Sequence, residues 1–210
     1  GKMSFSSEGA SSTVGTMVSS AGWVSGNSSE THFYVHGGGG NAEKIGKTSF
    51  ASGGNLAVTY NGGNNIADGG SCTEKDYGYC AGGASAGTNY YRYAFASDTS
   101  ISTYGTIPAA KDAVSGWSSS TKGYFVGGGT TDIKGFTFAS GGLQADVGDL
   151  VNTNYYSAAT SSTTYGYIAG QAPSYSDLIQ RMSFSSEGNA ADTGANLTRR
   201  FGYKSGFQYL

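Results

Sequence analysis

A unit of about 45 residues recurs along this chain of 210 residues, and the recurrence constrains the fold more than any other feature of the sequence. Each unit carries a phenylalanine at the same place, and successive phenylalanines are 45, 45, 43 and 46 residues apart: Phe5, Phe50, Phe95, Phe138 and Phe184. Four of them are preceded by an aromatic residue that leads into small residues and a glycine: Phe33, Tyr79, Tyr124 and Tyr167. Four are followed, ten residues later, by a glycine: Gly15, Gly105, Gly148 and Gly194. Three anchors in one register predict a repeat architecture.

Each anchor has the pattern of a β-strand. The residue two positions before the phenylalanine is usually large, as at Tyr93 and Phe136, and the residue between them is small, as at Ala94 and Thr137. This alternation places the two large side chains on one face of a strand. The aromatic segment that ends in the glycine pair alternates in the same way, and the remaining stretches, rich in small and turn-forming residues, predict two further short strands. Four strands in a unit of this length are typical of a blade of an all-β propeller.

The unit resembles the kelch repeat of β-propellers through its glycine pairs, which are Gly37-Gly38, Gly82-Gly83, Gly127-Gly128 and the degenerate Gly170-Gln171. The segments GNAADTGANLTRR, QADVGDL and SSTTYGYIAG are also similar to propeller-like repeats of marine bacteriophage virion and tail-fibre proteins. The likeness covers nearly the whole chain. It implies a kelch-like β-propeller and a virion or extracellular location.

The ends of the chain suggest how the blades are counted. We expect a single domain over residues 1–210, with four complete blades over residues 17–60, 64–107, 111–150 and 153–195. A fifth, composite blade is expected from residues 199–210 together with residues 2–16, so that the N- and C-terminal strands pair and close a five-bladed ring. The first residue is Gly1, which leaves open that the chain is part of a longer protein.

Composition and motifs disfavour several classes of function. Only 12% of the residues are charged, the net charge is -2, and lysine and arginine do not cluster, so nucleic acid is not an expected partner. No apolar run approaches the roughly 20 residues that cross a bilayer, so membrane insertion is not expected. His32 and His36, the only histidines, fall in one expected strand, and no nucleophile or phosphate-binding motif occurs. We therefore expect a protein that is not an enzyme and has no cofactor or metal.

Cys72 and Cys80 lie close together in the segment SCTEKDYGYC. Their spacing allows a disulfide that clips a hairpin, and it equally allows two unrelated buried thiols. Both interpretations stay open at this point.

The loops that follow the glycine pairs vary most between units and are rich in tyrosine, asparagine and serine, a composition suited to contacts with a ligand. In a propeller these loops share one face, and they supply the candidate ligand contacts Asn41, Asn89, Tyr90, Tyr91, Asp132, Tyr175 and Asp177. Two functions fit. One is a virion fibre or appendage adhesin that recognises a host receptor or glycan; the other is a structural virion or extracellular assembly protein whose faces dock other subunits, with oligomers as one outcome.

Overall fold

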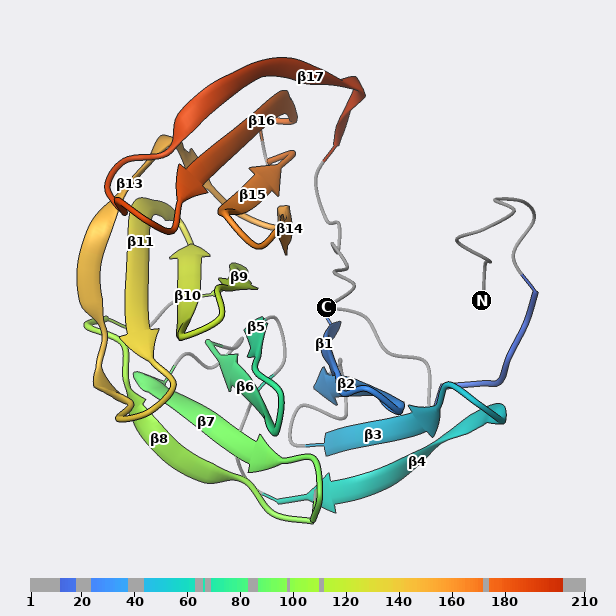
Figure 1. Cartoon of the computed structure of the whole chain (residues 1–210). Coiled ribbons are helices and arrows are strands. Elements are labelled where there is room, and N and C mark those ends of the chain that lie inside the picture. The colour runs from blue at the N-terminus through green and yellow to red at the C-terminus, as the bar shows by residue number, and fades with distance from the viewer. Residues whose placement is uncertain are drawn as a thin grey trace.

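The chain forms a four-bladed β-propeller, seen in a computed structural model (Figure 1). The structure describes residues 12–17, 24–37, 44–62, 66, 69–82, 87–97, 99–109, 112–171 and 174–201, and every regular element in these ranges is a strand. Among these residues there is no helix long and apolar enough to cross a membrane. The expected all-β propeller is therefore confirmed, while the expected number of blades is not.

Each blade is an antiparallel sheet whose strands follow one another in chain order. Blade A contains β1 (Val24–Ser28), β2 (His32–Gly37), β3 (Lys44–Ser49) and β4 (Gly53–Asn61). Blade B contains β5 (Gly70–Thr73), β6 (Tyr77–Ala81), β7 (Asn89–Ala94) and β8 (Ser102–Thr106). Blade C contains β9 (Val114–Ser118), β10 (Lys122–Gly127), β11 (Thr130–Thr137) and β13 (Ala145–Asn154). Blade D contains β14 (Ala158–Ser161), β15 (Tyr165–Ala169), β16 (Ser176–Ser183) and β17 (Ala191–Phe201).

The first strand of every blade lies at the centre of the molecule and the last strand lies at the rim (Figure 1). The inner strands β1, β5, β9 and β14 pack against one another in that order. Each sheet therefore presses a face against the next sheet, and both faces of a middle blade are buried.

A repeated serine closes the turn between the first two strands of three blades. In blade C the Ser119 hydroxyl accepts hydrogen bonds from the backbone N–H groups of Thr121 and Lys122, at 3.4 and 3.0 Å. Ser29 and Ser162 make the equivalent bonds in blades A and D. A short polar side chain that satisfies nearby backbone donors is what fixes such a tight turn.

Within the described part of the chain, the hydrophobic core forms three clusters, each between two neighbouring blades. The A–B cluster contains Tyr34, Ile45, Ile66, Cys80 and Tyr93. The B–C cluster contains Cys72, Tyr79, Ala81, Tyr90, Ile107, Val114, Phe125, Phe136 and Phe138. The C–D cluster contains Trp117, Tyr124, Val126, Ile133, Leu150, Ile168, Met182 and Ala190.

The sequence anchors meet in these clusters. The tyrosine of a second strand stacks on the repeated phenylalanine of the following blade: Tyr34 on Phe95, Tyr79 on Phe138 and Tyr124 on Phe184, with ring centroids 5.0, 5.1 and 5.4 Å apart. The two anchors therefore recur because each contact between blades needs one of each. In blade A, however, the stacking residue is Tyr34 and not the expected anchor Phe33, one position earlier.

The repeated glycines also mark the contacts between blades. At Gly105 of β8 a Cβ atom would overlap the carbonyl group of Gly142, which follows Phe138 in blade C. Here Gly142 and Leu143 form the short strand β12, which pairs with β8 in parallel. Gly148 meets Gly188 in the same way between blades C and D. We call each such line of contact, where the outer strand of one blade meets the turn of the next, a seam.

The expected five-bladed ring is wrong, because the residues that the structure describes form four blades. Residues 199–201 do not begin a new inner strand; they continue β17 along the rim of blade D, where Phe201 pairs with Ser176. Residues 12–17 lie along β4 of blade A, with the N–H groups of Gly54 and Leu56 donating to the carbonyls of Val14 and Thr16 at 2.8 and 3.0 Å. The rest of the expected composite blade, residues 2–11 and 202–210, lies outside the described residues.

The two cysteines are free and buried. In the antiparallel pair of β5 and β6, Cys72 lies opposite Tyr79 and Cys80 lies opposite Ser71. Because side chains alternate between the faces of a strand, the two thiols point to opposite faces of blade B and enter different clusters. The disulfide interpretation is therefore wrong, and the buried-thiol interpretation holds.

Candidate binding site

The candidate ligand contacts lie in or beside the connections between the second and third strands of the blades. Asn89, Tyr90 and Tyr91 begin β7, Asp132 lies near the start of β11, and Tyr175 and Asp177 flank the start of β16. Because the sheets are antiparallel and radial, these connections lie at the same end of every blade. Asn41 lies outside the described residues.

Tyr90 is not a surface residue. Its side chain is 0% exposed, and its hydroxyl donates to the carbonyl of Gly142 at 3.0 Å, so it holds the seam between blades B and C. Tyr91 on the other face of β7 is partly buried against the A–B cluster. The prediction that Tyr90 contacts a ligand is therefore wrong. Asn89, at the start of the same strand, is partly exposed.

Tyr175 and Asp177 do come together, in an open cleft of about 510 Å³ between blades C and D. The cleft is formed by the end of β13, the connection from β15 to β16, and the end of β17. Its lining residues are Asn152, Thr153, Gln171, Ser174, Tyr175, Ser176, Asp177 and Arg200. One aromatic ring, amides, hydroxyls, a carboxylate and a guanidinium thus face one space, a set that makes many hydrogen bonds to a polar ligand.

The conformation of Tyr175 is unusual. Its φ angle is +31°, on the side of backbone space that residues with a Cβ atom rarely occupy, and 51% of the residue is exposed. Such a conformation costs free energy that the surrounding turn has to offset. A large, exposed aromatic residue held in this way presents its ring to solvent at the mouth of the cleft.

Asp132 belongs to a different place, a small pocket in the seam between blades B and C. Its carboxylate lies 3.6 Å from the ammonium of Lys134, which also pairs with Asp146 at 2.8 Å. The expected contacts are therefore divided between two sites. Both sites flank the same end of blade C, because Gly127 lines the pocket and Thr153 lines the cleft. Between them, β11 pairs with β13 at Thr130 and Asn154.

The sequence did not predict several of the residues that line the cleft. Asn152, Thr153 and Arg200 come from the ends of outer strands, and only the pairing of β13 with β11, and of β17 with β16, brings them to this face. Tyr155 is also missing from the expected set, although it is 36% exposed just beyond β13. The run NTNYYS contained the usable signal, because it is as rich in asparagine and tyrosine as the loops that were chosen.

One of the two histidines, His36, is arranged as a structural residue. His36 is fully buried in the A–B contact, where its Nε2 lies 2.8 Å from the Tyr93 hydroxyl and its Nδ1 lies 3.2 Å from the Ser25 hydroxyl. The Tyr93 hydroxyl donates to Oδ1 of Asn27 at 3.2 Å, so Nε2–H of His36 donates to Tyr93 and Nδ1 accepts from Ser25. Burial lowers the pKa of His36 from 6.5 to about 3, which keeps the ring neutral. Among the described residues no group of histidine, cysteine, aspartate and glutamate side chains could hold a metal ion.

Fold and site together define the class of protein: a β-propeller with a polar cleft at one end, between two of its blades. In comparisons with known proteins, no protein-family model and no curated protein matches the chain. The assignment to a class therefore depends on the fold itself.

Proposed function

We propose that this protein is a non-catalytic binding module that recognises a carbohydrate through the cleft between blades C and D. The observation that carries the proposal is the exposed ring of Tyr175 beside the amide, carboxylate and guanidinium groups of Asn152, Asp177 and Arg200. Sugars offer hydroxyl groups that hydrogen-bond to such groups and C–H faces that pack on an aromatic ring. An open, polar cleft suits a ligand that stays largely hydrated.

We place this module on a virion fibre or appendage, or elsewhere outside the cell, where it attaches to a host receptor or glycan. The support for this setting is the similarity of the repeats to those of bacteriophage virion and tail-fibre proteins. The glycan is the ligand that the chemistry of the cleft favours.

A glycan array followed by titration of the best ligand tests the proposal. Tyr175→Ala is expected to weaken binding about tenfold, the loss of roughly 1.4 kcal/mol of stacking. Asp177→Asn and Arg200→Gln are each expected to weaken binding by breaking hydrogen bonds. Phe50→Ala is the matched control, since Phe50 is an aromatic residue of similar exposure, 47%, on blade A, and it should leave binding unchanged.

Two results would count against this function. If the protein binds no glycan on the array, the ligand class is wrong. If a glycan binds but Tyr175→Ala and Arg200→Gln bind it as tightly as the wild type, the cleft is not the site.

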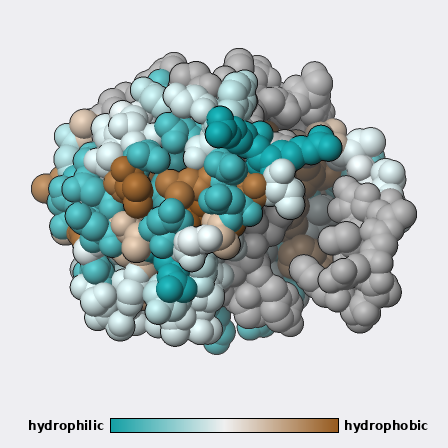
Figure 2. Space-filling view, turned by 90° about the horizontal axis from the view of Figure 1, so that it is seen from above, coloured by the Kyte–Doolittle hydropathy of each residue, from teal (hydrophilic) through white to brown (hydrophobic). Residues whose placement is uncertain are grey.

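A second function, assembly with other subunits, is favoured by exposed apolar side chains at the rim. Leu143 is 70% exposed and Val151 is 48% exposed. The side of the molecule shown in Figure 2 is mainly hydrophilic, with hydrophobic residues gathered in a band across it. Exposed apolar residues of this kind are a feature of docking surfaces. Cryo-electron microscopy of the native particle separates the two functions: rim residues buried against neighbouring subunits indicate assembly, and a free cleft indicates attachment.

A further inference from the structure

The connection from β13 to β14 carries two adjacent tyrosines, Tyr155 and Tyr156, beside the cleft. The connections that join the earlier blades instead carry the isoleucines Ile66 and Ile107, which are 1% and 4% exposed and belong to the core clusters. Tyr155, by contrast, is 36% exposed and belongs to none of the three clusters of the described chain. Core packing therefore explains the isoleucines, and it does not explain the exposed ring of Tyr155.

The ring of Tyr155 is held in one orientation by its neighbours. It stacks on the ring of Tyr156, with centroids 6.2 Å apart and an angle of 29° between the planes. A Cβ atom at Gly129 would overlap the Tyr155 hydroxyl, so the far end of the ring lies across that glycine. The N–H of Tyr156 donates to the carbonyl of Ala113 at 3.4 Å, which ties the connection to the start of β9. An exposed ring fixed in this way loses little conformational entropy when a ligand packs on it.

Tyr155 lies next to the cleft, at the same end of the molecule. Thr153, two residues earlier, lines the cleft, and two residues of chain span at most about 7 Å. The connection is also bonded to the opposite wall, because the Ser157 hydroxyl donates to the carbonyl of Gly170 at 2.9 Å, and Gln171 after it lines the cleft. The Tyr155 ring therefore borders the cleft and extends from it towards the β10–β11 turn of blade C.

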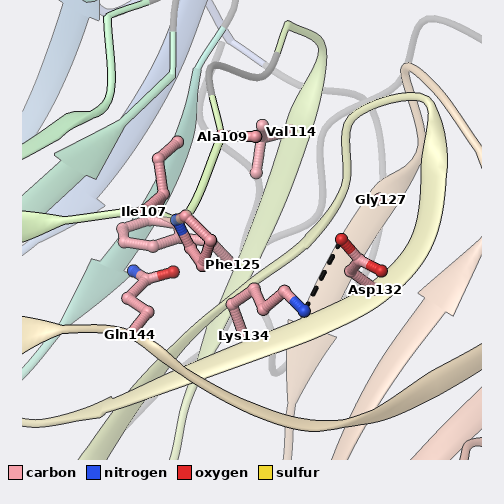
Figure 3. Close-up of a pocket in the computed structure, with 9 residues that line it drawn as sticks. Ile107, Ala109, Val114, Phe125, Gly127, Asp132, Lys134 and Gln144 are labelled. Atoms are coloured by element: carbon pink, nitrogen blue, oxygen red, sulfur yellow. Dashed lines mark ion pairs between the residues drawn. The ribbon is translucent and has the colours of Figure 1, made fainter.

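The charges around this surface favour a neutral ligand. Asp177 and Arg200, the charged residues that line the cleft, are one of each sign, and the connection from β13 to β14 carries no charge. In the neighbouring seam between blades B and C, Lys134 lies 3.6 Å from Asp132 and 2.8 Å from Asp146, and Figure 3 shows the first of these ion pairs. Two carboxylates and one ammonium give that group a net charge of −1. A chain that carries carboxylates or sulfates would be repelled there, and a neutral chain would not.

We propose that the cleft and the Tyr155 ring together bind a neutral, linear oligosaccharide. This inference rests on the proposed glycan-binding function and names its ligand class: an unbranched stretch of a polysaccharide rather than a single terminal sugar. One sugar residue packs on Tyr175 and makes its hydrogen bonds in the cleft, and a later residue of the same chain packs its C–H face on Tyr155. Two contacts that are joined by one short chain act together, so affinity rises with chain length.

Chain length provides a test on the wild-type protein. Isothermal titration calorimetry compares cellotetraose, maltotetraose and chitotetraose with glucose and N-acetylglucosamine. At least one tetrasaccharide is expected to bind about tenfold or more tightly than the monosaccharide from which it is built. Such a gain exceeds the statistical advantage of repeated sugar units. This arm of the experiment needs no variant.

Variants locate the second aromatic contact. Tyr155→Ala is expected to weaken binding of that tetrasaccharide about tenfold and binding of the monosaccharide much less. Tyr155→Phe keeps the ring and is expected to retain most of the affinity, whereas Tyr175→Ala should weaken binding of both sugars. Phe50→Ala is again the matched control, since it removes a ring of 47% exposure from blade A and should change neither affinity. Urea unfolding checks that each variant is folded, as expected for substitutions at exposed positions.

Each outcome separates this inference from the proposed function. If tetrasaccharides and monosaccharides bind equally well, the extended surface is overturned, while binding of a single sugar in the cleft survives. If a tetrasaccharide binds more tightly but Tyr155→Ala leaves its affinity unchanged, the chain follows another path and the inference is overturned. If no tetrasaccharide binds, the inference is also overturned, and the glycan array decides the proposed function separately.

Discussion

The stack between neighbouring blades predicts a large difference between two phenylalanines that occupy the same place in the repeat. Phe138 is 5% exposed and lies between Tyr79 and Phe136, with ring centroids 5.1 and 5.7 Å away. Phe50 is 47% exposed on blade A. Their backbones are equivalent, because each N–H donates to a threonine carbonyl in the turn before the second strand, at 3.0 and 2.9 Å. Replacing each by alanine therefore compares the side chains alone.

Phe138→Ala is expected to lower the free energy of unfolding by about 3–5 kcal/mol, the cost of a buried ring and the cavity it leaves. Phe50→Ala is expected to cost about 1 kcal/mol, because a half-exposed ring loses about half of the usual transfer free energy and leaves no closed cavity. Urea unfolding followed by circular dichroism and by the fluorescence of the tryptophans, including the buried Trp117, measures both values from the midpoints at a common m value.

Equal losses at the two positions would refute the reasoning. They would mean that Phe50 is covered as well as Phe138 is, and that the contact between blades is not what gives the repeated phenylalanine its role. A loss below about 1.5 kcal/mol for Phe138→Ala would refute the magnitude in the same way, since it falls below the range for emptying a packed aromatic site.

Two further predictions concern the contacts between blades. Gly105→Ala is expected to cost roughly 1–3 kcal/mol, measured by urea unfolding, because the new Cβ would overlap the Gly142 carbonyl; a neutral result would show that the seam separates without cost. His36→Gln is expected to flatten the acid side of the stability profile. The folded pKa of His36 lies near 3 and the unfolded value near 6.5, so below pH 6.5 the unfolded chain binds a proton that the folded chain does not. Wild type should therefore lose roughly 3 kcal/mol more than the variant between pH 7 and pH 4, and parallel profiles would contradict the burial of a neutral ring.

The strands and their grouping into blades could be predicted from the sequence because each anchor both favours a strand locally and makes a contact between blades. The alternation around Tyr93 and Phe136 reports a strand, and the even spacing of the phenylalanines reports successive sheets. The number of blades could not be predicted in the same way. Residues 199–201 resemble the start of a unit, yet their backbone continues an existing ladder, and which pairing wins depends on contacts that a local pattern does not contain.

The assignment of side chains to surface or core failed for a physical reason. In a sheet with one wet face, alternation separates buried from exposed residues. In a propeller both faces of a blade pack against neighbouring blades. Tyr90 and Tyr93 are an odd number of residues apart and point to opposite faces of β7, yet both are buried, each in a different cluster. The same geometry separates Cys72 from Cys80. A loop composition rich in tyrosine therefore selects the exposed Tyr175 and the buried Tyr90 equally.

The repeat offers a better signal for function than loop composition does, and it lies in the positions where one unit departs from the others. Six residues after the repeated phenylalanine, four units carry Leu56, Ile101, Gln144 and Ala190. Equivalent positions do not have equal environments here: Gln144 and Ala190 are buried, whereas Leu56 and Ile101 are only partly buried. The glutamine is thus the one polar residue of the four, and its buried amide carries a cost because it has no hydrogen-bond partner among the described residues. In an internal repeat, each residue can be compared with the residues at the equivalent position of the other units. A departure from chemistry that the other units keep marks a residue to test first, by substitution, for a role beyond packing.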